Sequence, residues 1–328
     1  MELRKDYLLN RWVIISEKRG ERPKEFSKQE IIEEGKICYF CPGNEHLTPN
    51  ETFRVNKTGT DTWKIRCFLN KFPFITREGN PKFFTKGFFT HSHPYGYHEV
   101  LVETDVHSKQ LADLSEEEIK EIFEVYSKRI EFYSKKPKIK YVAVFKNSGR
   151  EGGTSIIHTH TQIAAWNMIP PTIEEEISAV ELYKKKHRKC PYCEIIKIEV
   201  RTKRKIYNGK YFAVFAPYAS RFHYETRIFP KEHLHSLLDL NDEQMKELAH
   251  VMKKILVKVT AITNSYNYYL HYSPPGKDLH FHITITPRMS VWAGFENSTG
   301  EIVNSVSPET AAEFYREDSK NRIKIINN

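Results

Sequence analysis

The sequence of 328 residues contains no apolar run near the ~18 residues that a membrane-spanning helix requires. Its first residues, Met1-Glu-Leu-Arg-Lys-Asp6, are charged where a secretory signal peptide needs an apolar segment. It also contains no low-complexity segment, and its 39% hydrophobic and 28% charged residues are ordinary for a globular chain. These absences predict a soluble, cytoplasmic protein with no membrane partner.

The sequence also lacks a strong excess of one charge. The net charge is +9, but Lys and Glu are interleaved along 115–136 and 172–189, as is typical of solvated helix faces. No zinc-finger, RNP or helix-turn-helix pattern is present, so we expect no nucleic-acid partner. A moderate basic excess instead suits small anionic substrates, because it raises their local concentration.

Cysteine is scarce, with five residues in the whole chain. Four of them form two Cys-x-x-Cys pairs, Cys38/Cys41 and Cys190/Cys193, and Cys67 stands alone. In a cytosolic protein such pairs are more typical of metal ligands than of disulfides. A thioredoxin-like pair would begin a helix within a βαβ pattern, whereas these pairs lie beside Pro and aromatic residues and resemble zinc knuckles.

An internal repeat accounts for most of the chain. The segments 102–115 and 228–241 align without a gap at His, Leu, Asp and Leu, with His107 matching His233. In each copy a Ser or Asn cap precedes an amphipathic helix, near 116–132 and 242–258. Strand-like runs follow at 141–145 and 266–272, and each leads to a His-x-His sequence that opens another strand. The repeat predicts a duplicated α+β unit.

The two predicted halves are residues 1–170 and 171–328. Pro170-Pro171 interrupts the chain at the junction, and Thr172 is predicted to cap a helix from Ile173 to about Lys186. Because both halves must build the same kind of sheet, we expect them to pack closely against each other.

The repeat supplies the same four candidate metal ligands twice. Tetrahedral zinc takes four Cys or His ligands, often in pairs that are close in sequence, and a closed site of this kind is structural. The alternatives in the second set are His235 and His282, or iron in place of zinc, although two thiolates favour zinc. The sequence predicts two structural zinc ions per chain, held by Cys38, Cys41, His107 and His158, and by Cys190, Cys193, His233 and His280.

The segment 145–162 carries the candidate chemistry. His158, His160 and Gln162 share one face of the predicted strand, beside a Gly-rich loop whose N–H groups can approach a phosphoryl group. A neutral imidazole is a good nucleophile towards phosphorus, so we expect His160 to form a covalent nucleotidyl adduct. Gln162 and Ser155 are placed to hydrogen-bond the phosphoryl oxygens. The alternative is that His160 is only a packed strand histidine.

Several further segments match one known family, and the chain resembles the galactose-1-phosphate uridylyltransferases of the histidine-triad superfamily over nearly its whole length. The matching segments are Asn10-Arg-Trp-Val-Ile-Ile-Ser16, Cys38-Tyr-Phe-Cys-Pro-Gly-Asn-Glu45, Leu69-Asn-Lys-Phe-Pro73, Phe145-Lys-Asn147, His158-x-His160-x-Gln162 and Gly294-Phe-Glu296.

The resemblance implies an α+β fold of two histidine-triad-like units, with a mainly antiparallel sheet and flanking helices. It implies ping-pong transfer of UMP between UDP-glucose and galactose-1-phosphate, with the carbonyl of His158 fixing the tautomer of His160. It also implies a homodimer with shared sites, in which Phe295 and Glu296 reach the hexose in the partner's site. The residues implied to contact the nucleotide or its phosphates are Arg19, Arg22, Asn70, Asn147, Gly153, Thr154, Ser155 and Gln162.

Some positions differ from the family pattern. The motif reads His-Thr-His-Thr-Gln where the family usually has His-Pro-His-Gly-Gln, and Thr154 stands where a Cys is usual. Many members use a Glu and three His at the second metal, where this chain has Cys190 and Cys193. The sequence Thr299-Gly300-x-x-x-Asn304 resembles the related ADP-glucose phosphorylases. An adenylyl-transferring phosphorylase and a non-catalytic, zinc-stabilised nucleotide-binding module therefore stay open as alternatives.

Overall fold

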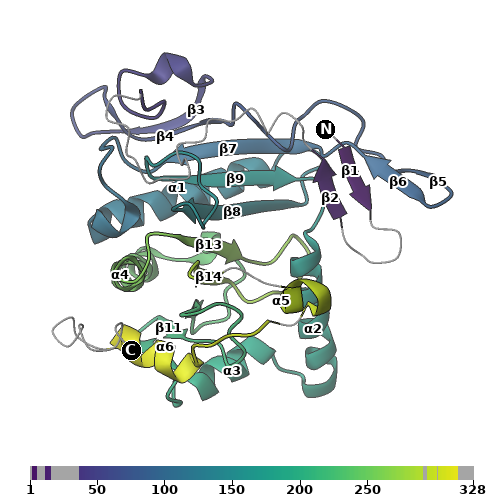
Figure 1. The fold of residues 1–328 in the computed structure, drawn as a ribbon, viewed down its shortest axis with the longest axis vertical. Coiled ribbons are helices and arrows are strands. Elements are labelled where there is room, and N and C mark those ends of the chain that lie inside the picture. Colours follow the sequence, from purple (N-terminus) through teal and green to yellow (C-terminus); the bar gives the residue numbers. More distant parts are fainter. Residues whose placement is uncertain (1, 6–11, 16–36, 291–293, 301, 317–328) are drawn as a thin grey trace.

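A ten-stranded antiparallel sheet forms the centre of the molecule (Figure 1). The computed structural model describes residues 2–5, 12–15, 37–290, 294–300 and 302–316. The strands of the first half are β3 (Glu51–Asn56), β4 (Trp63–Leu69), β7 (Gly96–Val102), β8 (Tyr141–Ser148) and β9 (His160–Trp166). Those of the second half are β10 (Lys205–Asn208), β11 (Phe212–Phe215), β12 (Thr226–Pro230), β13 (Tyr266–His271) and β14 (His282–Pro287).

The strand order confirms the duplication. The order is β10-β11-β12-β14-β13-β8-β9-β7-β4-β3, so the five strands of each half follow the same sequence from an outer edge to the centre. The halves join where β8 pairs with β13, with Tyr266 opposite Ser148 and Tyr269 opposite Phe145. The halves therefore share one continuous sheet, and we propose residue 170 as the boundary between them.

The two long helices begin where the sequence predicts. α1 (Glu116–Ser134) starts after Ser115, whose side chain accepts a hydrogen bond from the Glu118 N–H, and α4 (Asp242–Thr260) starts after Asn241 in the same way. Each follows a short 3-10 helix, at η3 (Leu111–Asp113) and η4 (Leu237–Asp239). α1 and α4 pack against each other and against the sheet, and their apolar faces supply much of the core.

The junction between the halves is formed by α2 (Pro171–His187) and α3 (Pro191–Glu199). The prediction that Thr172 caps α2 is wrong, because Pro170 is the N-cap residue and Pro171 is the first residue of the helix. Proline suits this first position, since its fixed φ is already helical and no hydrogen bond from its nitrogen is needed. The helix ends at His187, and the C-cap residue Arg188 adopts a left-handed conformation with φ 58°.

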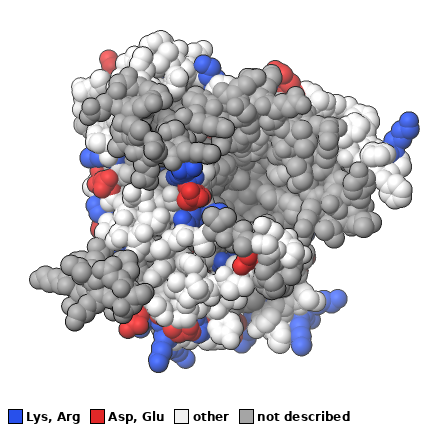
Figure 2. Space-filling view, viewed as in Figure 1, with Lys and Arg blue, Asp and Glu red and all other residues white. Residues whose placement is uncertain are grey.

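A smaller sheet and three short helices complete the described fold. The sheet order is β2-β1-β6-β5, from β1 (Glu2–Lys5), β2 (Trp12–Ile15), β5 (Phe84–Lys86) and β6 (Phe89–Ser92). The helices are η2 (Glu45–Leu47), α5 (Gly294–Thr299) and α6 (Pro308–Arg316). None of the described helices combines the length and the apolar character needed to cross a membrane. In Figure 2, acidic and basic side chains of the described residues are interspersed.

Candidate active site and metal-binding clusters

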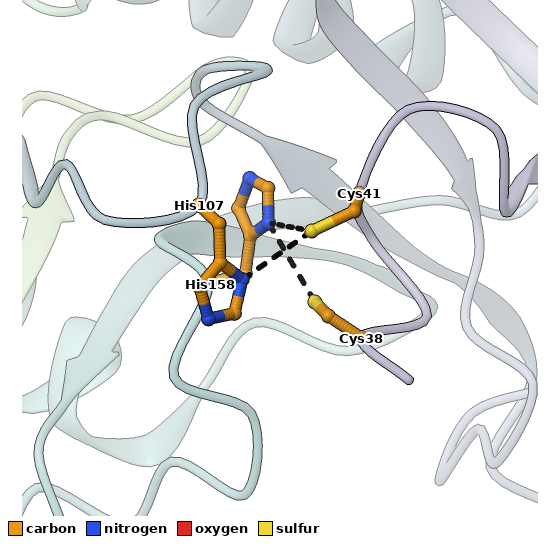
Figure 3. Close-up of side chains that lie close together, drawn as sticks. All are labelled: Cys38, Cys41, His107 and His158. Atoms are coloured by element: carbon orange, nitrogen blue, oxygen red, sulfur yellow. Dashed lines mark hydrogen bonds between the residues drawn. The ribbon is translucent and has the colours of Figure 1, made fainter. Parts of the chain in front are cut away.

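The first predicted set of metal ligands lies together in space. Cys38 and Cys41 lie in the turn before β3, while His107 follows β7 and His158 precedes β9. One ligand atom from each of the four lies within 4.8 Å of the others, and the side chains point toward a common centre (Figure 3). The Sγ–Nδ1 distances are 3.6 Å for Cys38–His158, 3.4 Å for Cys41–His107 and 3.7 Å for Cys41–His158.

These distances fit a tetrahedral metal ion. Zinc bonds of about 2.3 Å to sulfur and about 2.0 Å to nitrogen would place the sulfur and nitrogen atoms about 3.5 Å apart. The Nε2–H of His158 donates to the Thr104 carbonyl at 2.7 Å, which leaves Nδ1 with the lone pair that a metal needs. Burial raises the pKa of the Cys38 thiol to about 12, so a bound cation would be needed to keep it ionised. The cluster could therefore hold a metal ion.

The second predicted set is assembled in the same way. Cys193 Sγ lies 3.4 Å from His233 Nδ1 and 3.5 Å from His280 Nδ1, and Cys190 completes the cluster. The opposite ring nitrogens are held by a carbonyl and a carboxylate: His280 donates to Pro230 at 2.9 Å, and His233 lies 2.8 Å from Asp278. This cluster could also hold a metal ion, with His233 and His280 supplying its two nitrogen ligands.

Two pKa shifts in the second cluster have opposite directions. Burial raises the pKa of Cys190, but hydrogen bonds from His233 and His280 outweigh it and lower that pKa to about 5. Burial and the neighbouring Cys190 charge raise the pKa of Cys193 to about 12.

His235, the alternative ligand, lies instead 3.7 Å from Asp278, with a side chain that is 54% exposed.

His160 is held as a neutral imidazole with a defined tautomer. Its Nδ1 lies 2.9 Å from the carbonyl oxygen of His158, so the N–H is assigned to Nδ1 and the lone pair to Nε2. Burial, and then the charge of Lys146, lower the pKa of His160 to about 4. The ring of Phe40, from the Cys-x-x-Cys turn, packs edge-on against His160 at 5.2 Å between centroids. This arrangement suits a nucleophile that must be uncharged at neutral pH.

Gln162 belongs to a hydrogen-bonded group that includes a residue the sequence analysis missed. His98, buried on β7, lies with Nε2 2.9 Å from Gln162 Oε1 and 3.4 Å from Asn70 Nδ2. The Asn70 side chain also accepts from the Phe72 N–H at 2.9 Å. The structure thus brings the predicted residues Asn70 and Gln162 together around His98. The sequence around His98 contains no recognisable motif, so His98 is identified as a neighbour of Gln162 only by the pairing of β7 with β9.

The Gly-rich loop connects β8 to β9 and contains Gly153, Thr154 and Ser155. Gly153 has a φ of 83°, which favours glycine. At Gly152 an added Cβ would lie 2.0 Å from the Ser148 carbonyl oxygen, so the tight turn excludes any larger residue. The Thr154 hydroxyl donates to the Ile156 carbonyl at 3.1 Å. The loop conformation therefore depends on the positive φ of Gly153 and on the absence of a side chain at Gly152.

The second half supports this loop through Asn267, which the sequence analysis also missed. On β13, opposite Asn147, the Asn267 amide donates to Asn147 Oδ1 at 2.9 Å and to the Gly152 carbonyl at 2.7 Å. Arg288 in turn donates to Asn267 Oδ1 at 3.3 Å. Asn267 therefore joins the predicted substrate-binding residue Asn147 to the backbone of the Gly-rich loop.

Replacing Asn267 with alanine is expected to raise the KM for a nucleotide sugar, the substrate that the sequence resemblance implies, about 10-fold, because two hydrogen bonds that order the loop are lost. We expect kcat to change by less than about threefold, since His160 keeps its own contacts. Steady-state kinetics measure both values. Asn241→Ala, which removes a helix cap far along the chain from the loop, is the matched control and should lower the melting temperature with little change in KM. An unchanged KM in Asn267→Ala would contradict this role.

Other predicted site residues are not placed at this site. Arg19 and Arg22 lie outside the described residues, as does the side chain of Phe295. Glu296 lies on α5, partly buried, and its predicted role depends on a partner subunit. Asn304, from the segment that resembles the phosphorylases, donates to the carbonyls of Ser220 at 2.9 Å and Phe222 at 3.1 Å.

The second half contains an altered counterpart of the His160 site. His282 repeats the bond of His160, with Nδ1 3.0 Å from the His280 carbonyl. However, Glu176 lies 2.7 Å from His271 Nδ1 and 3.9 Å from His282 Nε2, and these three side chains could also hold a metal ion. Two of the three, Glu176 and His271, line a cavity of about 350 Å³. His282 therefore faces a carboxylate and a second imidazole, in contrast to the Gly-rich loop beside His160.

The comparisons with known proteins agree over both halves. Residues 1–170 match the family model described as galactose-1-phosphate uridyl transferase, N-terminal domain. Residues 189–294 match a second family model, described as scavenger mRNA decapping enzyme C-term binding. An ADP-glucose phosphorylase of Arabidopsis thaliana is 33% identical over 97% of this chain and 93% of its own length. A galactose-1-phosphate uridylyltransferase of Thermotoga maritima is 31% identical over 97% of this chain and 98% of its own.

Solved structures show the same two relationships. The ADP-glucose phosphorylase of Arabidopsis thaliana with bound ADP-glucose has a TM-score of 0.77 and 32% identity, covering 98% of this chain and 99% of that one. A uridylyltransferase structure has a TM-score of 0.79 and 26% identity, covering 96% and 97%. Fold and relatives together define a nucleotidyltransferase enzyme. The chain belongs to the galactose-1-phosphate uridylyltransferase family.

Proposed function

We propose that this protein is a UDP-glucose–hexose-1-phosphate uridylyltransferase that transfers UMP through a covalent adduct on His160. The observation that carries the proposal is the neutral His160 imidazole, whose Nδ1 is held by the His158 carbonyl at 2.9 Å. That bond leaves Nε2 as the reactive atom and directs it away from the backbone. Galactose-1-phosphate is the proposed acceptor, because the family is named for that reaction.

The transfer is proposed in two in-line steps. In the first, His160 Nε2 attacks the α-phosphorus of UDP-glucose, a P–N bond forms, and the P–O bond to the departing glucose-1-phosphate breaks. In the second, a phosphate oxygen of galactose-1-phosphate attacks the same phosphorus, and the P–N bond breaks to release UDP-galactose. No proton has to be removed from His160 before attack, because its Nε2 already carries the lone pair.

The surrounding residues are proposed to stabilise the phosphoryl group during both steps. Gln162, whose Oε1 is engaged by His98, would present its amide N–H groups to the phosphoryl oxygens. Ser155 and the backbone N–H groups near Gly153 and Thr154 would contribute further donors from the loop. Asn70 and Asn147 would contact the nucleotide. We also propose that Arg19 and Arg22 bind phosphate groups, where bidentate guanidinium contacts fit.

The metal clusters are proposed to hold two structural zinc ions per chain. Each has two sulfur and two nitrogen donors at tetrahedral spacing, which leaves no open position for catalytic water. His158 would link one of these sites directly to the chain segment of His160. We further propose a homodimer in which Phe295 and Glu296 reach the hexose bound by the partner.

A second candidate is an ADP-sugar phosphorylase, which would pass AMP from the same histidine to inorganic phosphate. Two observations favour it: the relative with 33% identity bears that name, and the segment Thr299-Gly300-x-x-x-Asn304 resembles those enzymes. The chemistry at His160 would be the same, and the base and the acceptor would differ.

Intact mass after mixing the protein separately with UDP-glucose and ADP-glucose tests both candidates. We expect a gain of one UMP per active site from UDP-glucose, lost on adding galactose-1-phosphate, because the second step removes the nucleotidyl group. A gain of one AMP, lost on adding inorganic phosphate, would instead establish the phosphorylase. Turnover with no adduct at any time would exclude the covalent mechanism. Stable nucleotide binding without turnover would instead support the alternative of a non-catalytic, zinc-stabilised nucleotide-binding module.

A further inference from the structure

A buried ion pair lies on the face of β9 opposite to His160. The Lys146 ammonium is 2.5 Å from Glu103 Oε2, and the two side chains are 1% and 0% exposed. Placing two charges this deep has a desolvation cost that their attraction does not automatically offset. Apolar residues of similar size would fill the same volume without that cost, so the pair calls for a role beyond filling the core.

The hydrogen bonds of Lys146 lead directly to the proposed nucleophile. A lysine ammonium has three donors. In addition to Glu103, Lys146 donates to the Thr159 hydroxyl at 2.8 Å and to the carbonyl oxygen of His160 at 3.0 Å. The ammonium is thus fully paired, and one of its bonds fixes the peptide plane of His160 itself.

The residues on either side of His160 join the same group. The hydroxyls of Thr159 and Thr161 donate to Glu103 at 2.5 and 2.7 Å, because alternate residues of the strand face away from His160 and Gln162. These are the two positions at which the sequence departs from the Pro and Gly of the usual family motif. The departures therefore place hydrogen-bonding groups directly against the buried carboxylate.

Two tyrosines extend this group into the second half. Tyr126 on α1 donates to Glu103 at 3.1 Å and lies 2.6 Å from the hydroxyl of Tyr268 on β13. Tyr268 is also 3.3 Å from the Thr161 hydroxyl. Both rings are fully buried. These hydrogen bonds connect the buried ion pair and the strand of His160 to the neighbouring half.

We propose that Glu103, Lys146, Thr159 and Thr161 form a positioning network that holds His160 for in-line attack on the nucleotide phosphorus. These are positioning residues, since each acts through the backbone or the flanking side chains of His160. The proposal rests on the proposed covalent role of His160. The network holds the carbonyl oxygen of His160 and the hydroxyls of Thr159 and Thr161. The strand therefore cannot slide or tilt, and this determines where His160 Nε2 lies.

The test compares two double variants that each neutralise a buried ion pair. Lys146→Met/Glu103→Gln removes both charges of the network and so avoids leaving one charge unpaired. Arg129→Met/Glu99→Gln is the matched control. That pair is equally buried, at 4% and 0% exposed side chains, and the hydrogen bonds of its carboxylate lead to α1 and β3 instead of β9. Each variant is compared with the wild type in melting temperature, in KM and in the rate of adduct formation, followed by quenched intact mass.

We expect the network variant to form the adduct about 100-fold more slowly with a KM close to that of the wild type, because misplacement of a reacting atom lowers rate more than binding. The control should change melting temperature without a comparable loss of rate. A network variant that forms the adduct at the wild-type rate would overturn the proposal. A wild type that turns over without an adduct would instead overturn the proposed function.

A milder variant keeps the test decisive if the first double variant fails to fold. Thr159→Val/Thr161→Val keeps the side-chain shapes and the ion pair and removes only the two hydroxyls beside His160. We expect adduct formation to slow about 10-fold with KM unchanged, since the carbonyl bond from Lys146 persists. Wild-type rates in this variant, with its fold confirmed by circular dichroism, would likewise overturn the positioning role.

Discussion

Replacing His160 with asparagine is expected to lower turnover of the nucleotide sugar at least about 10⁴-fold, because it removes the nucleophile proposed to form the covalent intermediate. Asparagine is chosen because its amide can still donate to the His158 carbonyl, which the imidazole Nδ1 contacts at 2.9 Å. The fold around the strand should therefore persist while the nucleophile is removed. Turnover is measured by following release of glucose-1-phosphate, and the intact mass should show no nucleotidyl adduct.

His282→Asn provides a matched control within the same molecule. His282 holds the equivalent place on β14 and makes the equivalent bond to the His280 carbonyl, at 3.0 Å. Its Nε2 faces Glu176 at 3.9 Å, so loss of its ring should cost stability without removing the nucleophile of the proposed covalent step. We expect turnover within about threefold of the wild type wherever the variant is folded. Equal losses in both variants would show that the effect of His160→Asn is structural.

Those parts of the fold that depend on local sequence were predictable. Ser115 and Asn241 mark the starts of α1 and α4 because a polar side chain must satisfy the first N–H groups of a helix. The duplication was visible because equivalent residues perform the same local tasks in both halves. It predicted the same kind of sheet in each half, and the matched strand order confirms this. The assembly of both Cys/His sets followed from the pairing of each Cys-x-x-Cys with one His and one His-x-His.

The residues that the sequence analysis missed all depend on which strands become neighbours. His98 meets Gln162 because β7 pairs with β9, and Asn267 meets Asn147 because β13 pairs with β8. Lys146 and Glu103 lie 43 residues apart in the chain and meet only beneath β9. A pattern in a single sequence indicates the periodicity along one strand, but it does not show which residues of two neighbouring strands pair with each other. The wrong prediction that Thr172 caps α2 was a local error, because the N-cap residue is a proline and not a residue with a side-chain hydroxyl.

The second half contributes to the site of the first half rather than duplicating it. Between β13 and β14 the chain has Pro274-Pro275-Gly276 in place of the loop that begins at Gly149, and Thr284 stands where Gln162 would be expected. Yet adjacent residues of β13 support both sides of the His160 site. Asn267 holds the Gly-rich loop at 2.7 Å, and Tyr268 contacts Thr161 beneath the strand at 3.3 Å. The pairing of β8 with β13 thus connects the stability of the second half to the geometry of the first.

A large loss of stability is expected from breaking the first candidate metal-binding cluster. Cys38→Ser replaces a sulfur that lies 3.6 Å from His158 Nδ1 and that the proposed zinc ion would bind, and a hydroxyl is a much poorer zinc ligand. Because metal binding to such sites contributes directly to folding, we expect the melting temperature to fall by roughly 10 °C or more and zinc to fall from about two ions per chain to about one. Calorimetry and elemental analysis measure the two quantities.

The matching change in the second cluster separates stability from activity. Cys193→Ser should lose one zinc ion and a similar amount of stability, since its sulfur lies 3.4 and 3.5 Å from two His nitrogens. Only the first cluster contains His158, whose carbonyl is bonded to His160 Nδ1. We therefore expect Cys38→Ser to slow adduct formation at least about 10-fold at temperatures where both variants are folded, and Cys193→Ser to change it much less. If Cys38→Ser retained about two zinc ions and an unchanged melting temperature, the first cluster would not be a structural metal site. Equal rates in the two variants would instead mean that the cluster stabilises the fold without setting the position of His160.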